Sequence, residues 1–233
     1  MNILDEIRAE LRKNVDRKYR EGSVNFFKEK IRCYGVRTPI TRKIANKYFQ
    51  KIKHLNKREI FQLCEELLET NHNEEATIAF SWCYKIKGKF EKSDFKIFER
   101  WIDNYLTNWG MIDDFCTHSV GHLVYTYPEF IRDLKKWTKS KNRWMRRASA
   151  VSLIYCVNRK RFLNESFEIS SLLLTDEDDL VRKGYGWLLK EASNVYLKEV
   201  FNYVMKNKSR MPGVSLRYAV EKMPKPLKIK AMS

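Results

Sequence analysis

Glycine and proline are scarce in this 233-residue chain, which has only eight of the first and five of the second. An all-β chain needs many tight turns, and these two residues supply most of the backbone that turns require. Long apolar stretches are also missing. No run of 18 or more apolar residues exists, and residues 1–11 alternate charged and aliphatic residues where a signal peptide would have an apolar core. We therefore expect a helical protein with no leader peptide and no membrane partner.

The five cysteines are odd in number, dispersed, and never arranged as a CxxC pair. This usage is typical of reduced thiols in a cytosolic protein, so we expect a cytoplasmic location. Cys116, His118 and His122 have the spacing of metal ligands, but a fourth ligand is missing, and we expect no metal. Walker, GxGxxG and GxSxG motifs are absent too. The cysteines are Cys33, Cys64, Cys83, Cys116 and Cys156.

Positive charge is abundant: 46 Lys and Arg stand against 29 Asp and Glu, which gives a net charge of +17. Such an excess is typical of proteins that bind a polyanion. Residues 128–161 carry eleven Lys and Arg against Glu129 and Asp133, whereas acidic residues outnumber basic ones over 93–127. This basic block predicts a salt-sensitive, sequence-independent affinity for DNA phosphates; the alternative is a face of solvated lysines.

Apolar residues recur at helical spacing along the chain, beginning with Ile3, Leu4, Ile7, Leu11 and Val15. Thr38-Pro39 predicts a helix start that continues to about residue 54, and Ser93 predicts another N-cap. No segment has the pattern of a strand. The further expected helices are 56–70, 74–87, 93–107, 109–126, 128–139, 142–157, 164–174, 179–192, 195–207 and 212–223.

A repeat organises the second half of the chain. The order apolar, Arg, any residue, small recurs around Arg146, Arg182 and Arg217, which are 36 and then 35 residues apart. Each block begins the second helix of an expected helix pair, and a period near 35 indicates an α-solenoid. We expect one right-handed HEAT-like-repeat domain over 1–233, with five to six helix pairs, a basic concave face and a frayed basic tail at 224–233. An irregular helical bundle is the alternative.

Three tryptophans, Trp109, Trp144 and Trp187, lie in the expected second helices of successive helix pairs. Trp109 and Asp113 are four residues apart and so share one helix face. Asp114 would point about 100° away from that face. Trp144 lies near Arg147, and Trp187 follows in the next helix pair. Core packing is the alternative for each Trp, and a helix-dipole role is the alternative for Asp113.

Several segments together resemble the HEAT-like-repeat DNA alkylation-repair glycosylases of the AlkD type. The resemblance covers nearly the whole chain in matching order. The segments that carry it are Tyr34-Gly35-Val36-Arg37-Thr38-Pro39, Asn108-Trp109-Gly110-Met111-Ile112-Asp113, Trp144-Met145-Arg146-Arg147-Ala148 and Lys183-Gly184-Tyr185-Gly186-Trp187-Leu188-Leu189-Lys190-Glu191.

The resemblance implies excision of 3- and 7-alkylated purines from duplex DNA, without a metal or another cofactor and without full base flipping. Asp113 would be the catalytic carboxylate, Trp109 and Trp187 would pack on the deoxyribose of the lesion, and Arg147 would hold a neighbouring phosphate. The expected DNA-binding set is Arg143, Trp144, Arg146, Arg147, Arg182 and Phe26. Two positions depart from the family: Asn108 replaces a second Trp, and Phe26 replaces a Tyr that touches the DNA backbone.

The residue types also suit this chemistry on their own. An alkylated purine is already cationic, so its departure needs no general acid, and the sugar develops oxocarbenium character. One carboxylate can stabilise that cation and orient water, and indole faces add cation–π stabilisation. We expect a monomeric DNA glycosylase. The alternatives are a non-catalytic HEAT-like protein that binds distorted or branched DNA, and a scaffold for an acidic partner.

Overall fold

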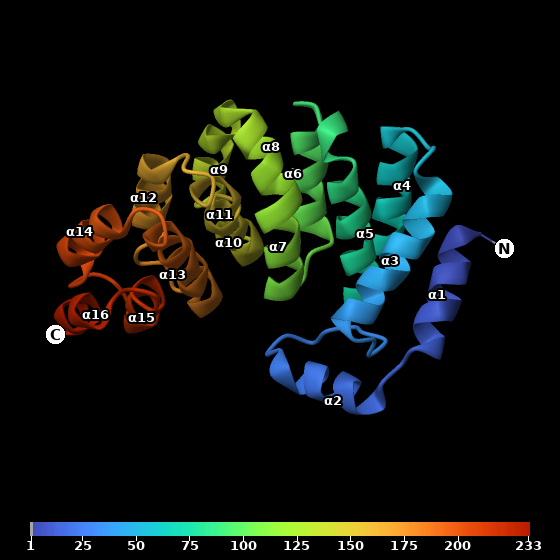
Figure 1. Cartoon of the computed structure of the whole chain (residues 1–233), viewed down its shortest axis with the longest axis horizontal. Coiled ribbons are helices and arrows are strands. Elements are labelled where there is room, and N and C mark those ends of the chain that lie inside the picture. The colour runs from blue at the N-terminus through green and yellow to red at the C-terminus, as the bar shows by residue number, and fades with distance from the viewer. Residues whose placement is uncertain (1) are drawn as a thin grey trace. The chain divides into compact units, whose positions relative to one another are not determined.

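The chain folds almost entirely into helices. The computed structural model describes residues 2–233, and the regular elements in that range are helical, apart from an isolated bridge between Arg32 and His72 (Figure 1). The helices are α1 (Ile3–Lys13), α2 (Arg17–Phe26), α3 (Thr38–Ile52), α4 (Lys57–Leu68), α5 (Asn73–Lys85), α6 (Asp94–Asn104), α7 (Trp109–Phe115), α8 (Gly121–Thr126), α9 (Ile131–Trp137), α10 (Arg143–Val151), α11 (Ile154–Val157), α12 (Leu163–Leu172), α13 (Asp179–Ser193), α14 (Leu197–Asn207), α15 (Gly213–Ala219) and α16 (Lys225–Met232). Short 3₁₀ turns span Lys87–Lys89 and Pro128–Phe130, and a π-helical turn spans Cys116–Val120.

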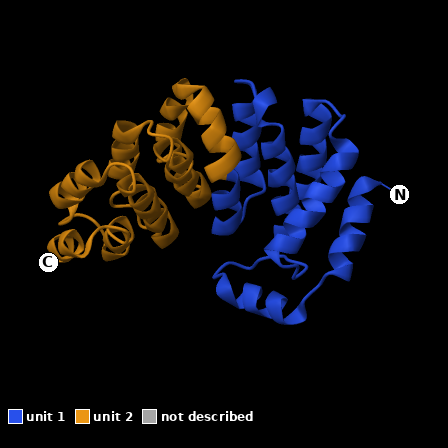
Figure 2. Cartoon of the chain, viewed as in Figure 1, with its two compact units in different colours: residues 1–115 blue, residues 116–233 orange. Residues whose placement is uncertain are grey.

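Two compact units divide the chain, residues 1–115 and residues 116–233 (Figure 2). In the first unit α5 packs against α3, α4 and α7, and α1 packs against α3. In the second unit α13 packs between α10 and α15, while α12 and α14 also contact α13. Helix pairs thus stack on neighbouring pairs within each unit, which is the arrangement of an α-solenoid. The predicted all-α solenoid class is confirmed; the single domain and the basic concave face stay predictions.

Most predicted helices agree closely with the structure. Those between residues 56 and 107, and between 164 and 207, match α4–α6 and α12–α14 to within three residues at each end. The predicted helix 109–126 is interrupted by the π turn, and 142–157 is divided between α10 and α11. Helix α2 was not predicted, because none of its residues is buried and it therefore lacks an apolar stripe.

One of the two predicted caps is displaced by one residue: Thr38 is the first residue of α3 and Arg37 is its N-cap. Ser93 is the N-cap of α6 as predicted, although its side chain makes no cap hydrogen bond. The Asp94 carboxylate, which is longer and charged, accepts from the Glu91 N–H at 2.7 Å instead.

The C-terminal segment is helical where the sequence analysis expected a frayed tail. Pro224 precedes α16, and a second proline lies in its first turn, where a missing N–H costs nothing. Helix α16 packs against α14 and buries Ala231, which is 1% exposed. Among residues 2–233, no helix is both long and apolar enough to cross a bilayer.

All five cysteines are buried and none forms a disulfide, in agreement with the expected reduced thiols. Burial raises the pKa of Cys156 to about 12 and raises that of Cys64 well above its usual value. The reactive thiolate is therefore suppressed at both positions.

Gly186 permits a close approach between α13 and α15 in the second unit. A Cβ at this position would lie 2.8 Å from the Tyr218 Cβ and 3.0 Å from the Ser215 carbonyl oxygen. These distances leave no room for a methyl group against backbone. The glycine–tryptophan motif, Gly184-Tyr185-Gly186-Trp187, therefore contains a packing glycine.

We expect Gly186→Ala to lower the free energy of unfolding by roughly 1–3 kcal/mol, because the added methyl group overpacks this contact. Gly22→Ala is the control: Gly22 lies inside α2, and a Cβ there meets nothing within 4 Å. That change should raise stability by up to about 1 kcal/mol through helix propensity. Urea denaturation of both variants measures the difference, and equal effects would contradict the packing role.

Candidate functional site

The six tryptophans fall into two groups by burial. Trp82, Trp101 and Trp137 are 0%, 0% and 3% exposed and belong to the core. Trp109, Trp144 and Trp187, which the sequence analysis assigned to the site, are all partly exposed. The core-packing alternative therefore describes the first group, while the second keeps indole surface that a ligand can reach.

In the first unit, Trp109 belongs to an aromatic cluster with Phe26 and Phe27. The Trp109 and Phe27 rings stack with centroids 5.0 Å apart and planes 25° apart, and Phe26 meets Trp109 edge-on at 5.7 Å. Phe26 is 70% exposed, which is unusual for a phenylalanine. Asp113 lies one turn after Trp109 on α7 and is partly buried. An exposed aromatic surface therefore lies on the same helix face as a carboxylate.

Asn108 fixes the start of α7. Its side chain is 1% exposed, accepts from the Met111 N–H at 3.1 Å and donates to the Asn73 Oδ1 at 3.0 Å. A Cβ on Gly110 would lie 3.2 Å from the Asn108 Oδ1 and 3.3 Å from the Phe27 ring. Asn108, which stands where the resembled family has a Trp, thus caps α7 directly before Trp109. The same side chain ties this cap to α5.

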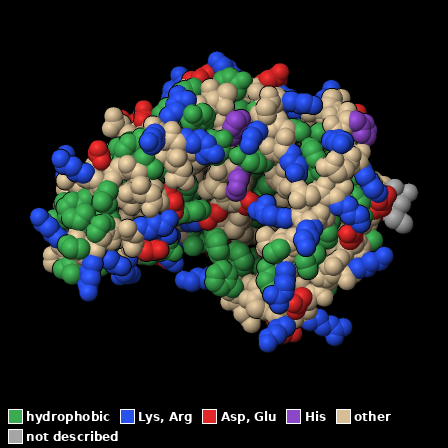
Figure 3. Space-filling view, in the orientation of Figure 1, with side chains coloured by type: hydrophobic (Ala, Val, Ile, Leu, Met, Phe, Trp, Pro, Cys, Tyr) green, Lys and Arg blue, Asp and Glu red, His purple; other side chains and the backbone are tan. Residues whose placement is uncertain are grey.

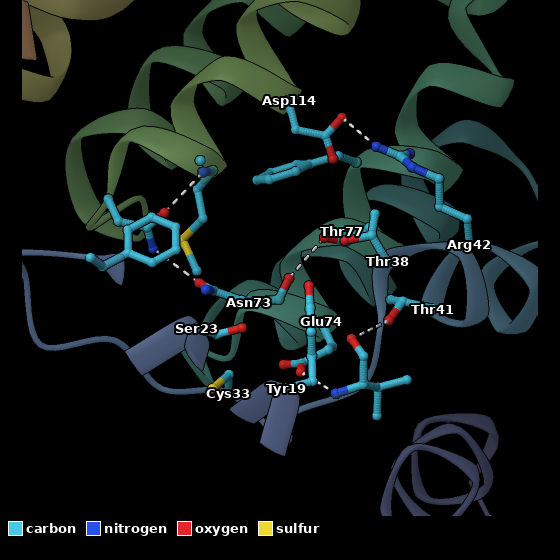
Figure 4. Close-up of a pocket in the computed structure, with 16 residues that line it drawn as sticks. Tyr19, Ser23, Cys33, Thr38, Thr41, Arg42, Asn73, Glu74, Thr77 and Asp114 are labelled. Atoms are coloured by element: carbon cyan, nitrogen blue, oxygen red, sulfur yellow. Dashed lines mark hydrogen bonds and ion pairs between the residues drawn. The ribbon is translucent and has the colours of Figure 1, made fainter. Parts of the chain in front are cut away.

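The neighbouring acid, Asp114, is engaged elsewhere. Its Oδ1 accepts from the Arg42 guanidinium of α3 at 2.9 Å (Figure 4). Both residues line a cavity of about 300 Å³ inside the first unit, together with Phe27, Asn73 and Thr77. This ion pair ties Asp114 of α7 to α3 within the first unit.

A buried carboxylate holds the turn that precedes α3. Glu74, 5% exposed, accepts from the backbone N–H groups of Tyr34, Gly35 and Val36 at 3.0, 2.7 and 2.9 Å. Gly35 has a φ of 93° and lies against the side chain of Arg20 in α2. Sequence reasoning missed Glu74, because a glutamate in the first turn of a helix is ordinarily explained by the helix dipole.

Asp16 ties the first turn of α2 to the start of α3. Its carboxylate accepts from the Tyr19 N–H at 3.0 Å and pairs with Arg37 at 2.9 Å. The Tyr19 hydrogen bond and then the Arg37 bond lower the pKa of Asp16. With Asp16 fixed at one end and Phe27 stacked on Trp109 at the other, α2 is held in place although it buries no residue of its own.

In the second unit, Arg143 and Trp144 form a partly exposed cation–π pair. The Arg143 guanidinium carbon lies 4.3 Å from the centre of the Trp144 ring. Arg143 also donates to Asp178 at 3.1 Å. A guanidinium held flat on an indole is preorganised, and it remains 35% exposed. Both residues therefore suit contact with a phosphate.

Arg147 is buried, at 5% exposed, and donates to the Leu180 carbonyl oxygen. Its side chain passes over Gly184, where a Cβ would lie 3.2 Å from the Arg147 Cγ. The first glycine of the glycine–tryptophan motif thus makes room for this arginine. Contact between Arg147 and a phosphate stays a prediction.

Arg146 and Arg182 converge on one loop between α12 and α13. Arg146 donates to the Asp176 carboxylate at 2.6 and 3.2 Å and to the Ser140 carbonyl at 2.9 Å, while Arg182 donates to the Asp176 carbonyl. The Arg146 side chain is 19% exposed and that of Asp176 is 8% exposed. These bonds explain why the 36-residue repeat contains arginine. They also weigh against the predicted DNA contacts of both residues.

Trp187 is oriented by Glu191, one turn later on α13. The indole Nε1 donates to the Glu191 Oε1 at 3.1 Å, and Lys222 donates to the same oxygen at 3.2 Å. Because the nitrogen edge is fixed in this way, the ring cannot rotate freely. Its partly exposed surface is therefore presented in one orientation.

The His118–His122 region has another explanation than a metal. His122 Nδ1 lies 3.0 Å from the Tyr155 hydroxyl, and Cys116 is fully buried. Within residues 2–233, no group of three or more His, Cys, Asp or Glu side chains could hold a metal ion.

The helical-repeat fold, the excess of cationic residues and the aromatic–carboxylate face define a class of α-solenoid proteins suited to bind DNA. Comparison with known proteins identifies the family. The model of the DNA alkylation repair enzyme family matches residues 7–223, and the chain belongs to that family. The fold is similar to that of the "Predicted DNA alkylation repair enzyme from Enterococcus faecalis", with a TM-score of 0.80 and 14% identity over 91% of this chain and 98% of that one. No curated protein matches the sequence.

Arg146→Gln should test the structural role of the repeat arginine. We expect a loss of roughly 2 kcal/mol in the free energy of unfolding, because charge-assisted hydrogen bonds to a buried aspartate disappear. The salt dependence of DNA binding should stay unchanged. Arg143→Gln, which removes an exposed guanidinium, should lower that salt dependence and cost less stability. A reversed pattern would assign Arg146 to the DNA interface.

Phe27→Ala should loosen Trp109 without touching Asp113, because the stacked ring disappears. In fluorine NMR of fluorotryptophan-labelled protein, we expect the Trp109 resonance to shift and sharpen, with assignment by Trp109→Phe. Phe26→Ala is the control, since its ring meets the indole only edge-on. An unshifted resonance in Phe27→Ala would show that the stacking does not hold the indole.

Proposed function

We propose that the protein is a DNA glycosylase that hydrolyses the N-glycosidic bond of positively charged 3- or 7-alkylated purines in duplex DNA. In this reaction water adds to C1′ of the deoxyribose, and the C1′–N bond breaks with its electron pair going to the purine. The base leaves neutral, because it was cationic at the start. The proton of the attacking water passes to the carboxylate or to solvent.

The observation that carries this proposal is the arrangement on α7. Trp109 and Asp113 share a helix face, Trp109 is oriented by Phe27 at 5.0 Å, and the adjacent acid is paired with Arg42 at 2.9 Å. The Asp113 carboxylate therefore lies on the same helix face as an oriented indole. A carboxylate near a developing oxocarbenium stabilises it and can orient water.

The indoles contribute in a different way. A cationic sugar beside an indole face gains about 0.5–2 kcal/mol from cation–π attraction. Trp187, with its nitrogen held by Glu191, offers a second oriented indole. We assign it to packing on a deoxyribose of the DNA, on the strength of the family resemblance.

DNA binding is supported by charge. The chain carries a net charge of +17, and Lys and Arg side chains are spread over the visible face of both units (Figure 3). The partly exposed Arg143–Trp144 pair is assigned to the phosphate backbone. Arg147 keeps its predicted phosphate contact, and the exposed Phe26 ring keeps its predicted contact with the DNA backbone.

Asp113→Asn is the decisive variant. It should retain DNA affinity but release free base at least about a hundredfold more slowly, since it removes one preorganised charge. Single-turnover release of 7-methylguanine and 3-methyladenine from methylated duplex DNA measures the effect. Trp109→Ala and Trp187→Ala should give intermediate losses, because packing on the sugar disappears while the charge stays.

Asp114→Asn is the matched control, since it neutralises the neighbouring acid and should slow release far less. Equal rates for the wild type and Asp113→Asn would end the assignment of Asp113. A wild-type protein that binds the duplex and releases no base would instead be the non-catalytic DNA-binding alternative.

A further inference from the structure

The segment after α11 carries three consecutive cations. Arg159, Lys160 and Arg161 follow the end of that helix, and the first two are exposed. No carboxylate within residues 2–233 forms an ion pair with any of the three. Arg143 and Arg146, in the same unit, each bond an aspartate. The basic loop, defined as residues 159–161, is therefore a local concentration of charge that the protein does not neutralise.

The backbone of the basic loop is fixed. The Arg161 N–H bonds to the Cys156 carbonyl at 3.1 Å, and the Lys160 N–H bonds to the Val157 carbonyl at 3.0 Å. This pair of bonds is a Schellman motif, in which the residue at the position of Lys160 takes a left-handed conformation. Lys160 has a φ of 60°. Glycine fits that conformation without strain, so a lysine stands here at a position where glycine would be less strained.

Both guanidinium groups of the basic loop are held in place. Arg159 donates to the Tyr155 carbonyl at 2.9 Å, and its guanidinium carbon lies 3.5 Å from the centre of the Tyr155 ring. Arg161 donates to the Tyr125 carbonyl at 3.1 Å and lies 4.7 Å from the centre of the Tyr125 ring. The ring of the next residue, Phe162, also contacts this arginine: its centre is 4.6 Å from the Arg161 guanidinium carbon. A guanidinium stacked on aromatic rings keeps N–H donors at its edge.

We propose that the basic loop is a phosphate-binding site for the backbone of duplex DNA. Cations at three consecutive residues match a polyanion with repeated charges, and preorganised guanidinium groups lose little entropy when they bind phosphate. Arg143 and Trp144 lie in the first turn of α10, at least 15 residues before the basic loop. The basic loop is thus a second backbone contact, and it shares with the proposed function only the premise that the chain binds DNA.

The sharpest variant is Lys160→Asn. It removes the charge, yet asparagine tolerates the left-handed backbone, so the fold is preserved. The probe is a fluorescently labelled, undamaged duplex. For each phosphate contact removed, we expect the affinity at 0.1 M salt to fall about eightfold. The slope of log affinity against log salt concentration should become shallower by about one. Arg159→Gln and Arg161→Gln should each have the same effect, and Lys160→Arg should have none.

Lys198→Gln is the charge-matched control, since it neutralises an exposed lysine elsewhere in the same unit. If it changes the slope as much as Lys160→Asn, the effect is one of net charge and the proposal fails. An unchanged slope in all three neutralised loop variants would also overturn it. Base release at saturating DNA separates the two proposals: the loop variants should match the wild type, and a wild type without base release refutes the glycosylase alone.

Discussion

The arrangement of the candidate catalytic face depends on one buried carboxylate. Glu74 collects three backbone N–H groups of the turn at 34–36, and the positive φ of Gly35 lets Arg20 of α2 lie against that turn. A carboxylate that accepts several amide hydrogens in a buried place is stabilised by charge-assisted bonds. Because that turn anchors α2 and α2 delivers Phe27 to Trp109, the orientation of the indole beside Asp113 is set at a distance by an α5 residue.

The second unit uses its arginines for two different purposes. Arg146 and Arg182 bond the loop at Asp176 and so connect neighbouring helix pairs. Arg143, Arg159 and Arg161 lie on aromatic rings with part of their surface exposed. Sequence counts place Arg146 in the same basic block as Arg143, Arg159 and Arg161, although Arg146 is bonded to a buried carboxylate. Net charge attracts DNA, but the partners of each arginine decide which ones touch it.

The sequence reasoning succeeded where local patterns decide structure. Scarce glycine and proline with apolar spacing of three and four predicted an all-helical chain, and the recurrence of Arg146, Arg182 and Arg217 predicted stacked helix pairs. It failed at α2 and α16, for different reasons. Helix α2 buries nothing and has no stripe to recognise, and α16 owes its order to packing of Ala231 near α14.

The sequence by itself determined the fold class, the excess of positive charge and the pairing of Trp109 with Asp113, because helix periodicity fixes which residues share a face. Only the tertiary structure decided which residues of the same type are buried or ion-paired and which are exposed. It separated core tryptophans from partly exposed ones, and it gave Asp114 an Arg42 partner from a helix 72 positions away. It also bonded Arg146 to Asp176 and left the basic loop without carboxylate partners. Burial and ion pairing depend on contacts between distant segments, and no local pattern encodes them.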